Sequence, residues 1–143
     1  MITKLTKQIV VALVAILFMH TASAQQITYS KDKADLHEYL KITKVGKTKI
    51  SYEIYMVSGG CSEFKSSGVA TLKTSKLGGE SDIDEDDNAF DIALYEGKSK
   101  GIAVTIKLGV QKGYTNRARF SWYNTKSEED PCKTTSESLI KSK

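Results

Sequence analysis

The sequence predicts an all-β fold, a small antiparallel meander that closes into a barrel or folds into a sandwich. Apolar and polar residues alternate in several short runs, which is the pattern of strands with one buried face. Glycine-marked turns separate these runs, and no long amphipathic helix lies between them. Two cysteines allow one intramolecular bridge. We therefore expect about six to eight strands and one disulfide.

The first 24 residues form a predicted signal peptide. Two lysines precede an apolar run over residues 9–19, and small residues at positions 22–24 supply a cleavage site. An uncleaved anchor is the alternative, but a bilayer-spanning helix needs about 20 apolar residues and this run is shorter. We expect cleavage, no membrane insertion afterwards, and a periplasmic or secreted product.

Residues 25–143 are predicted to form a single domain. These 119 residues carry a net charge of +2, from 19 basic and 17 acidic residues. A chain of this length buries roughly 65% of its unfolded surface around one modest core. The basic residues are scattered along the sequence instead of being gathered in one region, so no nucleic-acid partner is indicated. We expect a monomer.

The chain is organised around a predicted strand that begins at Thr48. Its apolar residues take alternate positions on one side: Ile50, Tyr52, Ile54 and Met56. Two glycines then end the strand, and Cys61 follows at once. Cys61 and Cys132 both lie in the exported part, where disulfides form, so we expect them to pair. The bridge would hold the C-terminal tail to the turn after the strand.

The segments before this strand leave alternatives open. Residues 25–35 suit a short edge strand or a loose arm. Residues 36–42 have a period-2 apolar face that Glu38 interrupts, which predicts a strand joined to the next by the turn at Gly46. A helix over residues 32–40, with Ser30 as its cap, is the alternative.

Four further strands are predicted after Cys61. They cover residues 69–73, 90–95, 102–110 and 117–123. In the second of them Leu94 faces inward with the apolar set and Tyr95 faces outward. In the last, Ala118, Phe120 and Trp122 face the core. Residues 124–143 are polar, and we expect a loosely ordered tail except where the disulfide holds it.

No catalytic set is evident. His37 is the one histidine after the leader, and no glycine-flanked serine accompanies it. With both cysteines oxidised, the ligands for a zinc site are too few. The sequence therefore predicts a protein that is not an enzyme and that carries no metal or cofactor.

Residues 81–88 are predicted to form a solvated acidic loop, because their charge density resists burial. The carboxylates of the loop are Asp82, Asp84, Glu85, Asp86 and Asp87. Three of them alternate like the first ligands of a calcium loop, but the glycine and the final glutamate of an EF-hand are missing. An irregular calcium site is one alternative, and a contact surface for a cationic partner is another.

The outer face of the last predicted strand is a second candidate contact surface. Arginine and tyrosine are the residue types that most often anchor protein interfaces. This face presents three such side chains: Arg117, Arg119 and Tyr123.

Several runs of the chain are similar to a known family. These runs are Leu40-Lys41-Ile42, Gly46, residues 49–54, Gly60-Cys61 and residues 67–72. Over about half of the mature chain, the sequence resembles the small exported bacterial β-domains that include the periplasmic inhibitors of C-type lysozyme. The resemblance implies a compact antiparallel barrel with one structural disulfide, which pushes a loop into the lysozyme cleft. Residues 67–69 and 121–124 approximate the family's Ser-Gly-Ala and Tyr-Trp-Ser-Lys-Gly segments.

The sequence thus predicts an exported protein-binding domain, and the role we expect is inhibition of a cationic secreted or host enzyme such as lysozyme by loop insertion. The predicted contacts are a turn formed by Ser66, Ser67 and Gly68, the acidic residues Asp82, Asp84, Asp86 and Asp87, and the outer face of the last strand. The alternatives are a cell-envelope module that holds calcium or glycan, and a secreted β-domain with a structural role.

Overall fold

The computed structural model describes residues 24–74, 80–126, 132 and 134–143. Residues 1–23 of the predicted signal peptide lie outside this part. Within it, no helix has the length and apolar character needed to cross a membrane. The strands are β1 (Gln26–Lys33), β2 (Leu36–Lys44), β3 (Lys49–Ser58), β4 (Phe64–Thr74), β5 (Ser81–Ile83), β6 (Ala89–Ser99), β7 (Ile102–Gly109), β8 (Arg117–Asn124) and β9 (Leu139–Lys141).

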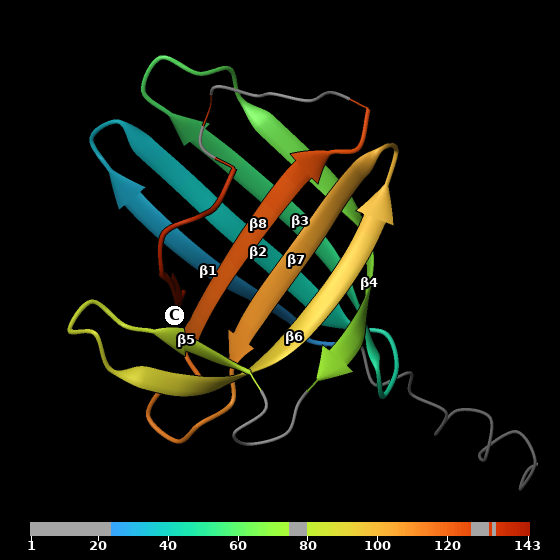
Figure 1. Cartoon of the computed structure of the whole chain (residues 1–143), viewed down its shortest axis with the longest axis vertical. Helices are drawn as coiled ribbons and strands as arrows, with labels where there is room; N and C mark the ends of the chain where they lie inside the picture. The colour runs from blue at the N-terminus through green and yellow to red at the C-terminus, as the bar shows by residue number, and fades with distance from the viewer. Residues whose placement is uncertain (1–23, 75–79, 127–131, 133) are drawn as a thin grey trace, which may run out of the picture.

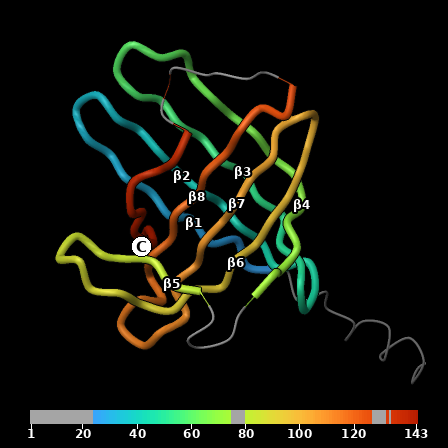
Figure 2. Tube along the Cα trace, viewed as in Figure 1, coloured from blue at the N-terminus to red at the C-terminus, as the bar shows by residue number. Residues whose placement is uncertain are grey.

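Eight of these strands form a closed antiparallel barrel (Figures 1 and 2). The order around the barrel is β4-β3-β2-β1-β9-β8-β7-β6, and a second pairing of β4 with β6 closes it. The short β5 pairs with β6 and extends the sheet beyond the barrel wall. The predicted all-β class is therefore confirmed, and of the two architectures left open the structure has the barrel.

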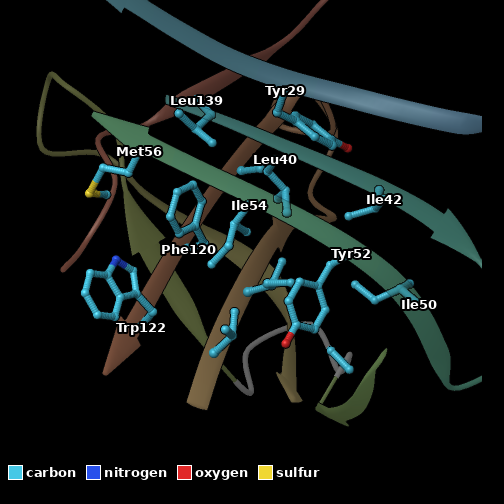
Figure 3. Packing of buried hydrophobic residues seen from close by; sticks show 14 residues of the cluster. Tyr29, Leu40, Ile42, Ile50, Tyr52, Ile54, Met56, Phe120, Trp122 and Leu139 are labelled. Atoms are coloured by element: carbon cyan, nitrogen blue, oxygen red, sulfur yellow. The ribbon is translucent and has the colours of Figure 1, made fainter. Parts of the chain in front are cut away.

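The core fills the barrel interior, as Figure 3 shows. The predicted inner face of β3 is confirmed, since its four alternating apolar residues are all buried. Phe120 of β8 and Ile106 of β7 meet them from the opposite wall and are fully buried. Burying a side chain of this size stabilises the fold by about 1.5–3 kcal/mol. The alternation seen in the sequence thus produces one continuous core.

The first two strands form a hairpin along their whole length, from the pair Gln26 and Thr43 to the pair Lys33 and Leu36. Residues 26–33 are therefore a strand, and the helical alternative for residues 32–40 is wrong. Glu38, which interrupts the apolar face, also points inward and is only 1% exposed. Its Oε2 accepts a hydrogen bond from the backbone N–H of Glu137 at 2.8 Å, so this carboxylate holds the C-terminal segment.

Two glycines allow β4 and β6 to close the barrel around Tyr52. A Cβ atom on Gly97 would lie 2.7 Å from the carbonyl oxygen of Val69. A Cβ atom on Gly68 would lie 2.9 Å from the hydroxyl oxygen of Tyr52. Both distances are below van der Waals contact, so a side chain at either position would push the strands or the tyrosine aside.

The C-terminal segment completes the barrel. Leu139 of β9 is fully buried, and β9 lies between β1 and β8. Before β9, the N–H of Ser136 donates to the carbonyl of Phe120, and the N–H of Trp122 donates to the carbonyl of Thr134. The predicted loosely ordered tail is therefore wrong for residues 134–141, because β8 supplies backbone partners that local sequence cannot indicate.

The N-terminal part of β6 serves a second, smaller apolar cluster. Phe90 and Ile92 are buried, but they do not belong to the main core cluster. The ring of Phe90 stacks on Tyr114 with 4.4 Å between the ring centroids. This small cluster joins the β5–β6 hairpin to the loop between β7 and β8.

Further along β6 the buried face changes. Tyr95, predicted to face outward, packs against the barrel core, while Leu94 is only partly buried. The prediction for this pair is wrong because Phe90 and Ile92 are buried on the face of β6 that points away from the barrel interior, and Leu94 shares that face. Tyr95 lies on the opposite face, where it pairs with the buried Ile106 of β7. Val110, the last residue of the strand predicted over 102–110, lies beyond the end of β7 and is exposed.

The predicted bridge between Cys61 and Cys132 is present. Cys61 lies in the turn after β3, where its N–H donates to the carbonyl of Ser58 at 3.0 Å. The disulfide therefore fastens the chain ahead of β9 to this turn. Disulfides of this kind are typical of exported proteins.

Candidate functional site

Two arginines of β8 hold the β5–β6 hairpin against the barrel. Arg119 Nη1 donates to Asp82 Oδ1 at 3.0 Å, and Arg117 Nη1 donates to Glu85 Oε2. We call these two pairs the arginine clamp. The structure thus joins two sets of residues that the sequence predicted as separate contact surfaces.

Asp82 corrects the prediction of a fully solvated acidic loop. It lies in β5, and its side chain is only 8% exposed. The guanidinium of Arg119 supplies the opposite charge, and the backbone N–H of Ile83 donates to the same carboxylate oxygen at 3.0 Å. Burial of this carboxylate is possible because both a charge partner and a hydrogen bond compensate for lost hydration.

Asp84 organises the turn at the end of the hairpin. Its Oδ1 accepts the backbone N–H groups of Asp86 and Asn88 at 3.0 and 2.9 Å. Its Oδ2 accepts the Tyr114 hydroxyl at 3.1 Å. These bonds, that of the Asn88 N–H first, lower the pKa of Asp84, and the bond to Asp84 raises the pKa of Tyr114. The turn is therefore held by bonds within the protein itself.

Tyr114 was not among the predicted site residues. It lies in the loop between β7 and β8, fixes Asp84 through its hydroxyl and packs its ring on Phe90. The one signal in the sequence is an aromatic side chain inside a polar, glycine-containing turn. Such a residue points to a loop that packs against another part of the fold.

Asp86 and Asp87 occupy the tip of the hairpin. Both are exposed, and neither forms an ion pair with any residue that the structure describes. Asp87 has a positive φ of 62°, which is one of the conformations that a tight turn requires. Figure 1 shows this tip, drawn in yellow-green, projecting beyond the barrel wall. The two carboxylates are thus presented on a rigid projection.

The predicted turn of Ser66, Ser67 and Gly68 does not exist. These residues lie inside β4 and pair with β3, with Ser66 opposite Ile54. The strand continues through them because Gly68 fits beside Tyr52 where a larger residue would not. The two serines line a shallow pocket with Ser99 and Lys100. Figures 1 and 2 place this part of β4 away from the β5–β6 hairpin.

Tyr123 lies apart from the arginine clamp. It is 62% exposed and lines a shallow groove on the outer wall with Lys73 and Glu96. It follows Arg117 by six positions along β8, which is roughly 20 Å in an extended strand. The outer face of β8 therefore divides into two separate surfaces. The β5–β6 hairpin covers the one with Arg117 and Arg119, and Tyr123 belongs to the other.

The outer wall of β2 and β3 carries a cluster that the sequence did not reveal. The rings of Tyr39 and Tyr55 stack with 5.0 Å between their centroids. The Tyr39 hydroxyl donates to Glu53 at 2.7 Å, and Lys41 Nζ lies 3.4 Å from the same oxygen. Burial, and then the bond to Glu53, raises the pKa of Tyr39 to about 12. The cluster satisfies its own polar groups and stiffens this wall.

The calcium alternative gains no support from the hairpin. Within the part of the chain that the structure describes, no three His, Cys, Asp or Glu side chains gather as metal ligands. Asp82 and Asp84 already use their oxygens on Arg119, on backbone N–H groups and on Tyr114. His37, exposed on β2, lies 2.9 Å from Asp32 in a surface pair.

We expect the hairpin turn to withstand mild acid. The pKa values of Asp84 and Glu85 lie below their ordinary values of 3.8 and 4.5. A carboxyl whose pKa is lowered by folding stabilises the fold above its ordinary pKa, and the contribution is lost as the pH falls through the lowered value. The NMR signals of the Tyr114 ring should therefore stay constant down to about pH 5 and move only below about pH 4. A transition centred above about pH 5 would contradict this account.

The site as a whole is a rigid acidic hairpin, clamped to a closed barrel by Arg117 and Arg119. Its neighbours on the surface include Lys31, Lys33 and Glu137, which line a small pocket beside the clamp. No protein-family model, no curated protein and no solved structure matches this chain.

Proposed function

We propose that this protein is an exported, non-catalytic binding domain that presents the acidic tip of the β5–β6 hairpin to a cationic protein. A secreted or host enzyme such as lysozyme, with a basic surface around its cleft, is the partner class. The barrel serves as the rigid support, and the hairpin is the contact element.

The observation that carries the proposal is the presentation, on a hydrogen-bonded turn, of two carboxylates that form no ion pair with a described residue. Asp86 and Asp87 are exposed at the tip, while Asp82, Asp84 and Glu85 at its base are bound to Arg119, Tyr114 and Arg117. A contact loop that is already ordered loses less conformational entropy on binding. Unpaired acidic groups at a projecting tip also accelerate and orient the encounter with a basic surface.

The proposal changes the contact residues relative to the sequence prediction. The Ser66–Gly68 segment lies within β4 and cannot enter a cleft as a loop. The arginines of β8 act within the protein, as supports of the hairpin, since both are bound to its carboxylates. The resemblance to the lysozyme inhibitors supports binding through a projecting loop. In this protein we assign that role to the β5–β6 hairpin.

The test is binding and inhibition of a purified C-type lysozyme. We expect saturable binding at micromolar concentrations, loss of lytic activity, and slower association as salt screens the charges. Asp86→Asn combined with Asp87→Asn should weaken binding about tenfold. The folded structure should keep its stability within about 0.5 kcal/mol, because both residues are exposed and asparagine tolerates the positive φ at position 87.

A matched control removes two acidic charges elsewhere. Asp35 and Glu96 are both exposed, and they lie outside the hairpin tip. Asp35→Asn combined with Glu96→Gln should leave lysozyme binding nearly unchanged. Unimpaired lysis at about tens of micromolar protein, or equal weakening by both double variants, would contradict the proposal.

A further inference from the structure

A pocket lies at the other end of β8, beside the disulfide. Its volume is about 200 Å³, enough for roughly seven water molecules or one small organic molecule. Its apolar floor consists of Met56, Phe64 and Trp122. Polar residues and the disulfide form its rim: Ser58, Ser62, Glu63, Cys61 and Cys132. An apolar floor with a few polar groups at the mouth of a barrel is the usual form of a small-molecule site.

Trp122 brings an unused hydrogen-bond donor to this pocket. The residue is only 6% exposed, and its indole N–H has no hydrogen-bond partner among the residues that the structure describes. Its ring is fixed by stacking on Phe64, with 3.7 Å between the centroids and 4° between the planes. Figure 3 shows the indole nitrogen turned toward Met56, another residue of the pocket floor.

An unpaired buried donor destabilises a fold, and tryptophan N–H groups in protein interiors usually have acceptors. The nitrogen of Trp122 is shielded from bulk water, so solvent does not supply the missing acceptor. Met56 is unbranched, and such side chains adapt their shape at low cost. An oxygen atom seated in the pocket can therefore reach the indole N–H once the Met56 side chain moves aside.

The rim sets the charge of the occupant. Glu63 is exposed at the pocket and forms no ion pair with a described residue. A carboxylate at the mouth repels anions and attracts a cationic group. The pocket thus offers three features in a fixed arrangement: an apolar floor, one donor and one negative charge.

From these features we infer that the pocket binds a small primary amine that has an apolar body and a carbonyl oxygen. The carbonyl accepts from Trp122 Nε1, the apolar body covers Phe64 and Met56, and the ammonium group lies near Glu63. A free amino amide and the amino-terminal residue of a peptide both have this chemistry. The inference is independent of the hairpin, whose clamp lies at the opposite end of β8.

Leucinamide is the probe, and Trp122 provides the readout. It is the only tryptophan of the chain, so the ¹⁵N-labelled protein has one indole N–H signal. Titration with leucinamide should move this signal saturably, with a Kd in about the millimolar range for so small a ligand. Isopentylamine, which lacks the carbonyl, should bind about fivefold more weakly and move the indole signal less. The tripeptide Leu-Gly-Gly distinguishes a free amino amide from the amino terminus of a peptide. It should bind as well as leucinamide only if the residues that follow the first one can extend out of the pocket.

Two variants test the assigned contacts by calorimetry. Trp122→Phe keeps an aromatic ring for Phe64 but removes the donor, so leucinamide should lose its advantage over isopentylamine. Glu63→Gln, at an exposed position, should weaken both amines about twofold to fivefold without changing their ratio. A purely structural role for Trp122 would not produce this selective effect.

The titration of the unmodified protein can overturn the inference even if Trp122→Phe does not fold. An indole signal that leucinamide leaves unmoved up to about tens of millimolar would do so. The same conclusion follows if leucinamide and isopentylamine move the signal equally, because the indole N–H then has no carbonyl partner.

Discussion

Replacing Leu139 by alanine should lower the free energy of unfolding by about 2–5 kcal/mol. Leu139 is fully buried in β9, where it packs into the main core between β1 and β8. The change removes buried apolar surface and leaves a cavity at the position where the barrel is completed. Urea unfolding followed by circular dichroism measures the effect.

Ile140→Ala is the matched control for this change. Ile140 is the next residue of the same short strand, and it is only partly buried. Its replacement keeps the backbone pairing of β9 and should cost clearly less than the replacement of Leu139. If both variants unfolded at the midpoint of the unmodified protein, the C-terminal segment would not be part of the barrel in solution.

The strands with long regular alternation could be predicted from the sequence. β3 and β7 each show alternating apolar residues over seven positions, and an alternation of that length is typical of a half-buried strand. The disulfide could be predicted too, because two cysteines in an exported chain leave one possible bridge. Closure of these strands into a barrel was left as one of two architectures, since strand number alone does not fix it.

Short strands and register shifts could not be predicted. β9 has three residues, which is too short for any period to appear, so the pairing of Leu139 depends on partners far away in the chain. In β6, Phe90 and Ile92 are buried outside the main core while Tyr95, on the opposite face, packs against it, so alternation alone does not show which face lines the barrel. Ser66 to Gly68 looked like a turn because glycine and serine are common in turns, yet here Gly68 makes room for Tyr52.

Most residues of the candidate site could be predicted from the sequence, but the contacts between them could not. The acidic residues and the arginines were both recognised, but Asp82 and Arg119 are 37 positions apart and only the barrel brings them to 3.0 Å. Tyr114 and Trp122 were missed as site residues for the same reason. Tyr114 matters because its hydroxyl binds Asp84, and Trp122 matters because its indole N–H lacks an acceptor among the described residues. Neither relation can be seen in the sequence.

Removing the disulfide should produce a loss of similar size to that of Leu139→Ala. Cys61 and Cys132 are 71 positions apart, and a loop of that length stabilises by about 4 kcal/mol in the chain-entropy model. A typical domain has only about 5–15 kcal/mol in total. The double variant Cys61→Ala and Cys132→Ala should therefore unfold at a urea concentration about 2 M lower. Reductant should lower the midpoint of the unmodified protein equally and leave that of the variant unchanged.

Combining the two changes separates two roles of the bridge. In the chain-entropy model the disulfide acts on the unfolded chain, so its loss and that of the Leu139 side chain should add within about 0.5 kcal/mol. If the bridge acted instead by holding the C-terminal segment in place, Leu139→Ala would already have released that segment. Removal of the disulfide would then cost much less in the Leu139→Ala background. We expect additivity, because β9 has its own backbone bonds to β1 and β8 and does not depend on the bridge for its position.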